Sequence, residues 1–372
     1  ALAALEARQG RMRTALDTVA TGEEVVPNYA PLTALRQRIE NGGPIPVEIQ
    51  SASQGAAAAL FSLGSAVNRD GAEETVILYM QFARALDPEN AWTLVTLGNV
   101  MEKIKKPEQA IELYKLVPED SPMRRLSELQ LGLALSDMGE HKEAREHLKA
   151  LIAEDPKNIR SYLAYGGVLS EDKAYEEMAA NYEEALRAVG PAQSSNDWNL
   201  HFQLGIAYER LGQWPKAEKA LKRALELQPN QPQVMNYLGY SWIDMNMNLE
   251  EGMDMIRGAV DLRPNDGYIV DSLGWAYYRL GEYDDAVREL ERAVELKPAD
   301  PTINDHLGDA YWRVGRKTEA GFQWNRALIN DPEADLKAEV EKKLADGLPE
   351  KSGAVPAADK GNADTKPADD RS

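Results

Sequence analysis

The sequence predicts an all-α fold, a solenoid of stacked helical hairpins, from three observations. A set of markers recurs every 34 residues over about three quarters of the chain, each recurrence holds two amphipathic stretches, and most recurrences end at a proline. A single hairpin of this kind cannot bury its apolar face, so neighbouring hairpins must stack.

The composition of the chain argues against some classes of binding partner. The chain has 372 residues, 43% of them hydrophobic, and no run of 18 apolar residues that could cross a membrane as a helix. Its 42 Lys and Arg against 61 Asp and Glu give a formal charge of −19. Such a surface repels nucleic-acid phosphates and acidic lipids, so we expect neither as a partner. The chain lacks cysteine, which excludes disulfides and thiolate chemistry but fits a reducing or an oxidising compartment.

The N-terminal segment, residues 1–56, is predicted to be a degenerate helical region followed by an extended linker. Ala15 follows Gly10 by five residues, a spacing that recurs within the repeats, and "PLTALRQRIENG" has the pattern of one further helix. Pro44 and Pro46 exclude a regular helix in "GPIPVEIQSASQ". Because the chain starts with Ala as if inside a helix, we expect further repeats, a signal peptide or a lipid anchor upstream.

The repeat is clearest around Gly274. Further markers follow it at fixed spacings: Tyr277, Ala286, Leu290, Ala293 and Pro298. The same frame, with single substitutions and one slip of one residue, predicts eight units at residues 57–90, 91–124, 125–158, 159–192, 198–231, 232–266, 267–300 and 301–334. Glycine without a Cβ lets the second helix of a unit approach the first closely, and Gly281 suits the left-handed turn between them.

Two C-terminal segments follow the last unit. Residues 335–348 form an amphipathic pattern with a charged outer face, which predicts the capping helix that solenoids need. Residues 349–372 are rich in Pro, Ala, Asp, Lys and Gly without large apolar residues, which predicts a disordered tail.

A period of 34 with these markers resembles the tetratricopeptide repeat. The resemblance implies a right-handed α-solenoid whose first helices line a concave groove. Members that bind acidic C-terminal tails carry Lys and Asn one turn apart on that groove. The matching pairs here are Val95/Asn99, Asn236/Tyr240 and Asp271/Trp275, and none contains Lys, so we do not expect that activity.

Catalysis is not expected from this sequence, and no cofactor is implied. No phosphate-binding loop, nucleophile elbow or H-E-x-x-H motif occurs. His141 and His147 lie six residues apart and cannot share a ligand face. His306 stands between Asp305 and Asp309, a conceivable metal cluster, but a solvated helix face is the more economical interpretation of a single imidazole among abundant acids.

A stripe on the first helices is the candidate partner site. Residues at −6, −3, +1 and +4 from the reference glycine share one face, and aromatic side chains gather there, with arginines beside them. The predicted partner-binding residues are Phe202, Asn236, Tyr240, Tyr268, Asp271, Trp275, Tyr278, Arg279, Trp312 and Arg313. The alternative is that these aromatics only pack against the adjacent unit, which leaves two interpretations open.

Residues 236–316 carry a narrower resemblance, through "NYLGYSWIDMNMNLEEGMDMIRGAVDLRPNDGYIVDSLGWAYYRLG" and "PTINDHLGDAYWRVGR". They are similar to the C-terminal part of large Gram-negative tetratricopeptide proteins, some of them envelope lipoproteins that bring substrates to carboxyl-terminal processing proteases. This implies a non-enzymatic adaptor that binds proteins or peptides, in the periplasm or attached to the outer membrane. The alternatives are a cytoplasmic location and a regulatory module of a larger enzyme or secretion complex. Self-association through a repeat edge is a further possibility.

Overall fold

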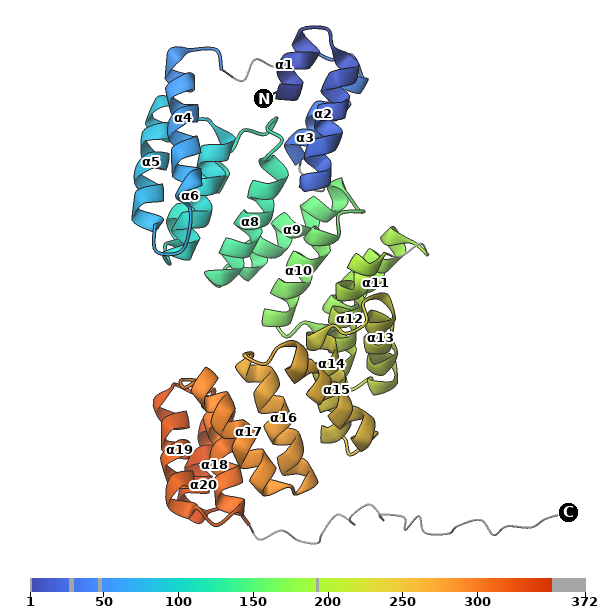
Figure 1. Ribbon diagram of the computed structural model, residues 1–372, viewed down its shortest axis with the longest axis vertical. Helices are drawn as coiled ribbons and strands as arrows, with labels where there is room; N and C mark the ends of the chain where they lie inside the picture. The colour runs from blue at the N-terminus through green and yellow to red at the C-terminus, as the bar shows by residue number, and fades with distance from the viewer. Residues whose placement is uncertain (1, 27–29, 46–48, 192–193, 350–372) are drawn as a thin grey trace, which may run out of the picture. The chain divides into compact units, whose positions relative to one another are not determined.

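The structure, a computed structural model, describes residues 2–26, 30–45, 49–191 and 194–349. By their contacts the residues fall into two compact units, Ala1–Gln193 with Gln203–Ala217, and Ser194–Phe202 with Glu218–Ser372. The described residues form 20 α-helices and one 3-10 helix, η1, without a β-strand (Figure 1). The prediction of an all-α fold is therefore confirmed, and the two units are described one at a time.

The first unit is a series of helices in which neighbours along the chain pack together. Contacts join α1 to α2, α4 to α5, α6 to α7, α8 to α9 and α10 to α11, and further contacts join α5 to α6, α7 to α8 and α9 to α10. The helices are α1 (Leu2–Arg8), α2 (Met12–Val25), α3 (Ala30–Glu40), α4 (Ala52–Ala66), α5 (Glu73–Leu86), α6 (Ala91–Lys103), α7 (Pro107–Lys115), α8 (Arg124–Asp137), α9 (His141–Glu154), α10 (Ile159–Glu171) and α11 (Tyr175–Val189). The unit boundary crosses α12 (Trp198–Arg210) and α13 (Trp214–Leu227), and η1 spans Ser195–Asp197.

Helices α1, α2 and α3 share a small core of their own. Its buried members are Ala3, Ala7, Ala15, Val19 and Ile39. Gly10 has a φ of 78° at the turn between α1 and α2, a backbone conformation that glycine adopts without steric cost. Residues 46–48 of the predicted linker lie outside the described residues. Helix α4 begins at Ala52, five residues before the predicted start of the first unit, because the Ser51 side chain accepts a hydrogen bond from the backbone N–H of Gln54 and caps it.

The second unit repeats the pairing of the first. Its further helices are α14 (Pro232–Asp244), α15 (Leu249–Leu262), α16 (Gly267–Leu280), α17 (Tyr283–Leu296), α18 (Pro301–Arg313), α19 (Lys317–Ile329) and α20 (Ala334–Asp346). Contacts join α14 to α15, α16 to α17, α18 to α19 and α19 to α20, and the first helices also touch one another, α14 to α16 and α16 to α18. One apolar core runs through this unit from Ile243 to Val340.

The close approach predicted at the reference glycines is found at Gly274 and Gly308. A Cβ on Gly274 would lie 2.6 Å from Leu290 Cγ, and one on Gly308 would lie 2.5 Å from Trp324 Cδ1. The side chains that fill these spaces are therefore the large residues at +16, Leu290 and Trp324, rather than the small alanines. Gly281 between α16 and α17 has a φ of 85°, as the turn requires.

Helix α20 occupies the place predicted for the cap, after the last hairpin. Its Val340 is completely buried and belongs to the core of the second unit. Of the predicted disordered tail, Pro349 is described and accepts a hydrogen bond from Arg313 through its carbonyl oxygen. Residues 350–372 lie outside the described residues.

Candidate functional site

We define the first-helix stripe as the residues of α14, α16 and α18 that the sequence predicts to share the groove face, together with His306. Because α14 contacts α16 and α16 contacts α18 directly, the stripe is continuous across three helices of the second unit. Its members are Asn236, Tyr240, Tyr268, Asp271, Trp275, Tyr278, Arg279, His306, Trp312 and Arg313.

Three rings form the centre of the stripe. Trp275 stacks on Tyr278 of its own helix with the centroids 4.6 Å apart, and on His306 of α18 with the centroids 4.0 Å apart. The i, i+3 spacing of Trp275 and Tyr278 places them on one face of α16, and His306 reaches them from the next first helix. These contacts hold the indole rigidly and link α16 to α18.

His306 also forms a buried ion pair. Its Nδ1 lies 2.9 Å from Asp271 Oδ1, and each side chain is 12% exposed. Burial alone would lower the pKa of His306, but the charges of Asp271, Asp305 and Asp309 outweigh it and the pKa is raised. The imidazolium is thus favoured at a position that also faces the indole of Trp275.

The two predicted arginines are engaged within the chain. Arg279 donates to Asp244 Oδ1 at 2.6 Å and to the backbone carbonyl of Asp244 at 2.8 Å, which joins α16 to the end of α14. Arg313 donates to the hydroxyl of Tyr278 at 3.2 Å and to the carbonyl of Pro349 at 2.8 Å. Both guanidinium groups therefore serve contacts between elements.

Trp312 is packed near the C-terminal end of the described chain. Its ring lies 5.4 Å from that of Trp324, and the ammonium of Lys317 sits 4.7 Å from its centroid. A Cβ on Gly347 would fall 2.2 Å from its ring, so the segment after α20 passes directly over the indole. Trp312 is half-buried, and this segment limits what else can reach it.

Tyr268 is the most open ring of the stripe. It is 55% exposed and lies under the ammonium of Lys297, 4.9 Å from the centroid. Tyr240 is half-buried, and burial raises its pKa to about 12. Asn236 lies one turn before Tyr240. Its Oδ1 and the Oε1 of Gln233 are buried, and neither accepts a hydrogen bond from the described residues.

Phe202 makes different contacts from the rest of the predicted set. It lies on α12, and its ring packs against Trp198 and, edge-on, against Tyr237 with centroids 5.8 Å apart. These partners are not members of the stripe.

A buried charge cluster next to the stripe was missed by the sequence analysis. Lys343 of α20 lies 2.7 Å from Asp305 Oδ2 and 3.0 Å from Asp309 Oδ2, and Trp324 Nε1 donates to Asp309 Oδ1 at 2.9 Å. All three charged side chains are less than a tenth exposed. Burial, followed by the charge of Asp309, raises the pKa of Asp305 to about 6, although Lys343 opposes the shift. The available signal was Lys343 itself, three residues after Val340 on the apolar face of the cap.

The metal cluster considered around His306 has a different arrangement. His306 pairs with Asp271, while Asp305 and Asp309 pair with Lys343. Within the described ranges no group of three or more His, Cys, Asp or Glu side chains is placed to hold a metal ion.

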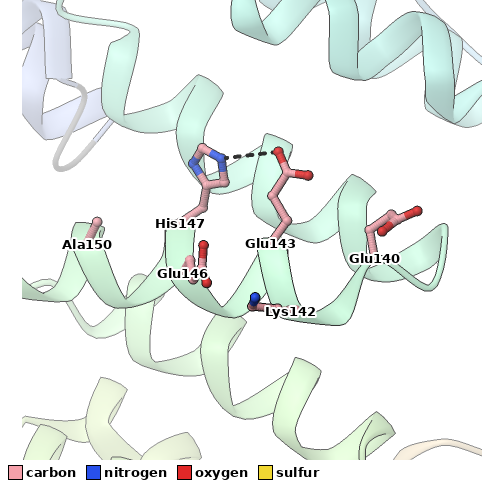
Figure 2. A pocket seen from close by; sticks show the side chains of 6 residues that line it. All are labelled: Glu140, Lys142, Glu143, Glu146, His147 and Ala150. Atoms are coloured by element: carbon pink, nitrogen blue, oxygen red, sulfur yellow. Dashed lines mark ion pairs between the residues drawn. The ribbon is translucent and has the colours of Figure 1, made fainter.

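The first unit has a shallow depression on α9, shown in Figure 2. His147 lies 2.8 Å from Glu128 Oε2 through Nδ1 and 3.9 Å from Glu143 Oε1 through Nε2. The lining residues are Glu140, Lys142, Glu143, Glu146, His147 and Ala150, all on α9 or at its N-terminal cap. Since one helix face supplies the whole lining, the depression has no convergent groups that could hold a ligand.

Comparison with known proteins places the chain among repeat proteins. Residues 274–315 match a family model described as TPR repeat, and residues 198–231 and 129–196 match models described as tetratricopeptide repeat. Among the described helices, none is long and apolar enough to traverse a lipid bilayer.

Similar proteins include two bacterial ones. TPR repeat-containing protein PA4667 of Pseudomonas aeruginosa is 28% identical over 197 residues, 53% of this chain and 32% of the relative. Lipoprotein NlpI homolog of Haemophilus influenzae is 30% identical over 95 residues, 26% of this chain and 30% of the relative. The chain thus spans about a third of the length of three of the curated relatives that it matches.

Solved structures share the fold. A tetratricopeptide repeat protein from Parabacteroides merdae superposes with a TM-score of 0.55 at 15% identity, covering 68% of this chain and 98% of the other. Residues 129–196, 198–231 and 274–315 therefore match tetratricopeptide repeats, and the consecutive helix pairs share the fold of a solved tetratricopeptide repeat protein.

Proposed function

We propose that this protein is a non-enzymatic scaffold or adaptor that holds a segment of a partner polypeptide on the first-helix stripe. Tetratricopeptide repeats are typically binding modules rather than catalytic ones. One observation carries the proposal: aromatic side chains from three successive first helices stay half-buried or exposed on one continuous face, backed by rigid stacking. Partly exposed aromatics on a fixed backing are the residues that most often anchor interfaces.

The chemistry of the stripe favours contacts to apolar side chains and to the backbone of the partner. Tyr268 offers an open ring, and Tyr240 and Trp275 offer partly exposed ones. The unpaired side-chain oxygens of Gln233 and Asn236 are acceptors that backbone N–H groups of an extended segment would satisfy after a small side-chain adjustment.

The arginines have a more limited role in this proposal. Arg279 would have to exchange Asp244 for a partner carboxylate, and Arg313 would have to release Tyr278 and Pro349. A partner carboxylate therefore competes with contacts that both arginines already make within the chain. The aromatic rings meet no such competition.

A bacterial envelope adaptor is the more specific form of the proposal. It is supported by the similarity to a protein named as a lipoprotein and by the resemblance of residues 236–316 to envelope proteins that serve carboxyl-terminal processing proteases. A location in the periplasm or on the outer membrane goes with it. The alternative, a regulatory module of a larger enzyme or secretion complex, is favoured by the Pseudomonas aeruginosa relative, of which the 197 matched residues make up 32%.

The test is site-specific cross-linking in the source organism. A photoreactive phenylalanine analogue replaces Tyr268 in one variant and Arg288, exposed on α17, in a matched control. We expect a discrete polypeptide adduct from position 268 and none from position 288, with the adduct identified by mass spectrometry. Equal adducts from both positions, or none from position 268, would refute the stripe as the partner site.

Cell fractionation of the same strain separates the specific forms. Protein in the envelope fraction, with an adduct that contains a protease or its substrate, supports the envelope adaptor. Cytoplasmic protein, or an adduct with a catalytic domain of its own longer chain, supports the regulatory module.

A further inference from the structure

Helix α4 leaves uncovered a face that its counterparts bury. Leu63, directly before the reference Gly64, is 54% exposed. Its equivalents in the repeat frame are buried to 7% exposure or less, namely Leu97, Leu131, Tyr165 and Leu204 in the first unit and Leu238, Leu273 and Leu307 in the second. The same residue position is thus core elsewhere and surface in α4.

Two neighbouring positions show the same difference. Ala59 and Ala66 are exposed on α4, whereas the equivalents of Ala59 in α6, α8, α10, α16 and α18 are all buried, and so are those of Ala66. In those hairpins the first helix packs against the second helix of the preceding pair, as α6 packs on α5 and α8 on α7. The uncovered face of α4 therefore consists of the repeat positions that form a helix–helix contact in the other hairpins.

Helix α5 extends this face with large apolar side chains. Leu78, Phe82 and Leu86 follow one another at intervals of four and are 55%, 55% and 39% exposed. The hydroxyl of Ser53 donates to the carbonyl of Leu86 at 2.6 Å, which ties the start of α4 to the end of α5. At the positions of Leu78 and Phe82, helix α17 carries Arg288 and Arg292, so the corresponding surface of α17 is charged.

Charge indicates what can cover the face. Helix α4 contains no charged residue in its 15 positions, although the chain carries a formal charge of −19. Two copies of so acidic a chain repel each other over most of their surface, and the repulsion is smallest where a neutral face meets a neutral face. We propose that the α4/α5 edge, defined by Ala56, Ala59, Leu63, Ala66, Leu78, Phe82 and Leu86, binds the same edge of a second copy.

The spacing of the edge suits a two-fold arrangement. Ala52, Ala56, Ala59, Leu63 and Ala66 alternate intervals of four and three, the seam of two packed helices. In an antiparallel pair centred on Ala59, each Leu63 lies opposite the Ala56 region of the other copy, and the helix dipoles oppose each other favourably. One surface is then complementary to itself.

The area predicts a weak dimer. The four large side chains and the alanines offer roughly 500 Å² per copy, which brings the total close to the lower limit of about 1,000 Å² for a specific interface. A dimer that dissociates on dilution is therefore expected. This proposal concerns a different face from the first-helix stripe and does not depend on it.

Cysteine cross-linking tests the geometry directly, because the chain contains no cysteine. Ala59→Cys should form a disulfide-linked dimer on mild oxidation, since the two thiols lie at the two-fold axis. Ala66→Cys should not, because the paired residues are about 21 Å apart along the helices at 1.5 Å per residue. A mixture of Ala52→Cys and Ala66→Cys chains should cross-link only to each other. Efficient self-linking of Ala66→Cys, or no linking at Ala59, would overturn the arrangement.

Sedimentation equilibrium over a range of concentrations tests the association itself. Wild type and Leu116→Glu, a variant at a similarly exposed site directly after α7, should approach twice the monomer mass of 41.2 kDa, and Leu63→Glu should remain monomeric. A monomeric wild type, or a dimer that survives Leu63→Glu, refutes the proposal. A monomer whose melting temperature falls in Leu63→Glu would show instead that another part of the same chain covers the edge.

Discussion

The last hairpin of the series, α18/α19, is covered by α20, whereas the first, α4/α5, presents a bare apolar edge. At the last hairpin Leu307 is 1% exposed, and at the first the equivalent Leu63 is 54% exposed. Helix α18 packs against α17 of the preceding hairpin, whereas α4 makes no comparable contact with α1, α2 or α3 among the described residues. The cap α20 is attached to the last hairpin by a buried Lys343 between two carboxylates as well as by Val340. Position in the repeat frame therefore does not decide burial by itself; the neighbouring element does.

The largest expected effect comes from breaking the attachment of the cap. Lys343→Met would leave Asp305 and Asp309 buried, one turn apart and without a cation, so one of them must take up a proton or the cap must open. Removing one partner of a buried charge pair typically costs about 3–5 kcal/mol. Urea unfolding should show this loss, with Lys342→Met, at an exposed neighbouring position, as the control. Equal stability of the two variants would mean that α20 is held by its apolar contacts alone.

The next effect compares the two equivalent leucines. Leu307→Ala should destabilise by about 2–5 kcal/mol, because it opens a cavity in a packed core. Leu63→Ala, measured at a dilution where the chain is monomeric, should stay within about 0.5 kcal/mol of wild type, as exposed substitutions do. Thermal or urea unfolding of both variants gives the comparison. A large loss for Leu63→Ala at high dilution would show that its face is covered within one chain.

A smaller effect is the pH dependence of stability that comes from the pair of His306 and Asp271. The pKa of His306 is raised in the folded chain. Its pairing with Asp271 therefore contributes fully to stability below the pKa of histidine in the unfolded chain, about 6.5. This contribution is lost as pH rises through the folded-state pKa. We expect the stability difference between wild type and His306→Gln to shrink as pH rises above the unfolded-state pKa of histidine, about 6.5. Urea midpoints at several pH values measure it. A difference that grows with pH would have the wrong sign.

The same reasoning applies to Asp305 in a lower range. Its folded-state pKa of about 6 lies above the ordinary value, so the folded chain retains a proton that the unfolded chain releases. Stability from this group is therefore lost as pH rises from about 4 to about 6. Helices α4 and α5 contain no histidine, and the hydrogen bond from Lys103 lowers the pKa of Glu73 at the start of α5.

The smallest effect is expected at the first hairpin, where an exposed ion pair has about the same length as the buried pair of Lys343 and Asp305. Lys103 lies 2.6 Å from Asp70, as close as Lys343 lies to Asp305, but the Asp70 side chain is fully exposed. Water screens such a pair, and Lys103 retains Glu73 as a second partner. Asp70→Asn should leave the urea midpoint unchanged within error. A loss comparable with that of Lys343→Met would mean that distance outweighs burial in this protein.

The stripe was partly predictable from the sequence. Helical spacing places Trp275 and Tyr278 on one face, and the repeat period brings the next first helix beside them. The same pattern could not reveal that His306 completes the stack, or that Arg279 is engaged by Asp244. Those contacts depend on the rotation of one helix against the next and on side-chain rotamers, which spacing along the chain leaves open.

What the sequence by itself determined is the repeat: its 34-residue period, the paired amphipathic helices and the glycines at their close approach, because these follow from local periodicity and from the small volume of glycine. Only the tertiary structure decided which equivalent positions are buried. Leu63 and Leu307 occupy the same position of the repeat frame, and the place of Lys343 on the apolar face of the cap does not show which carboxylates it meets. Burial is a property of what lies opposite a side chain, and in a solenoid that neighbour is a different hairpin or a cap.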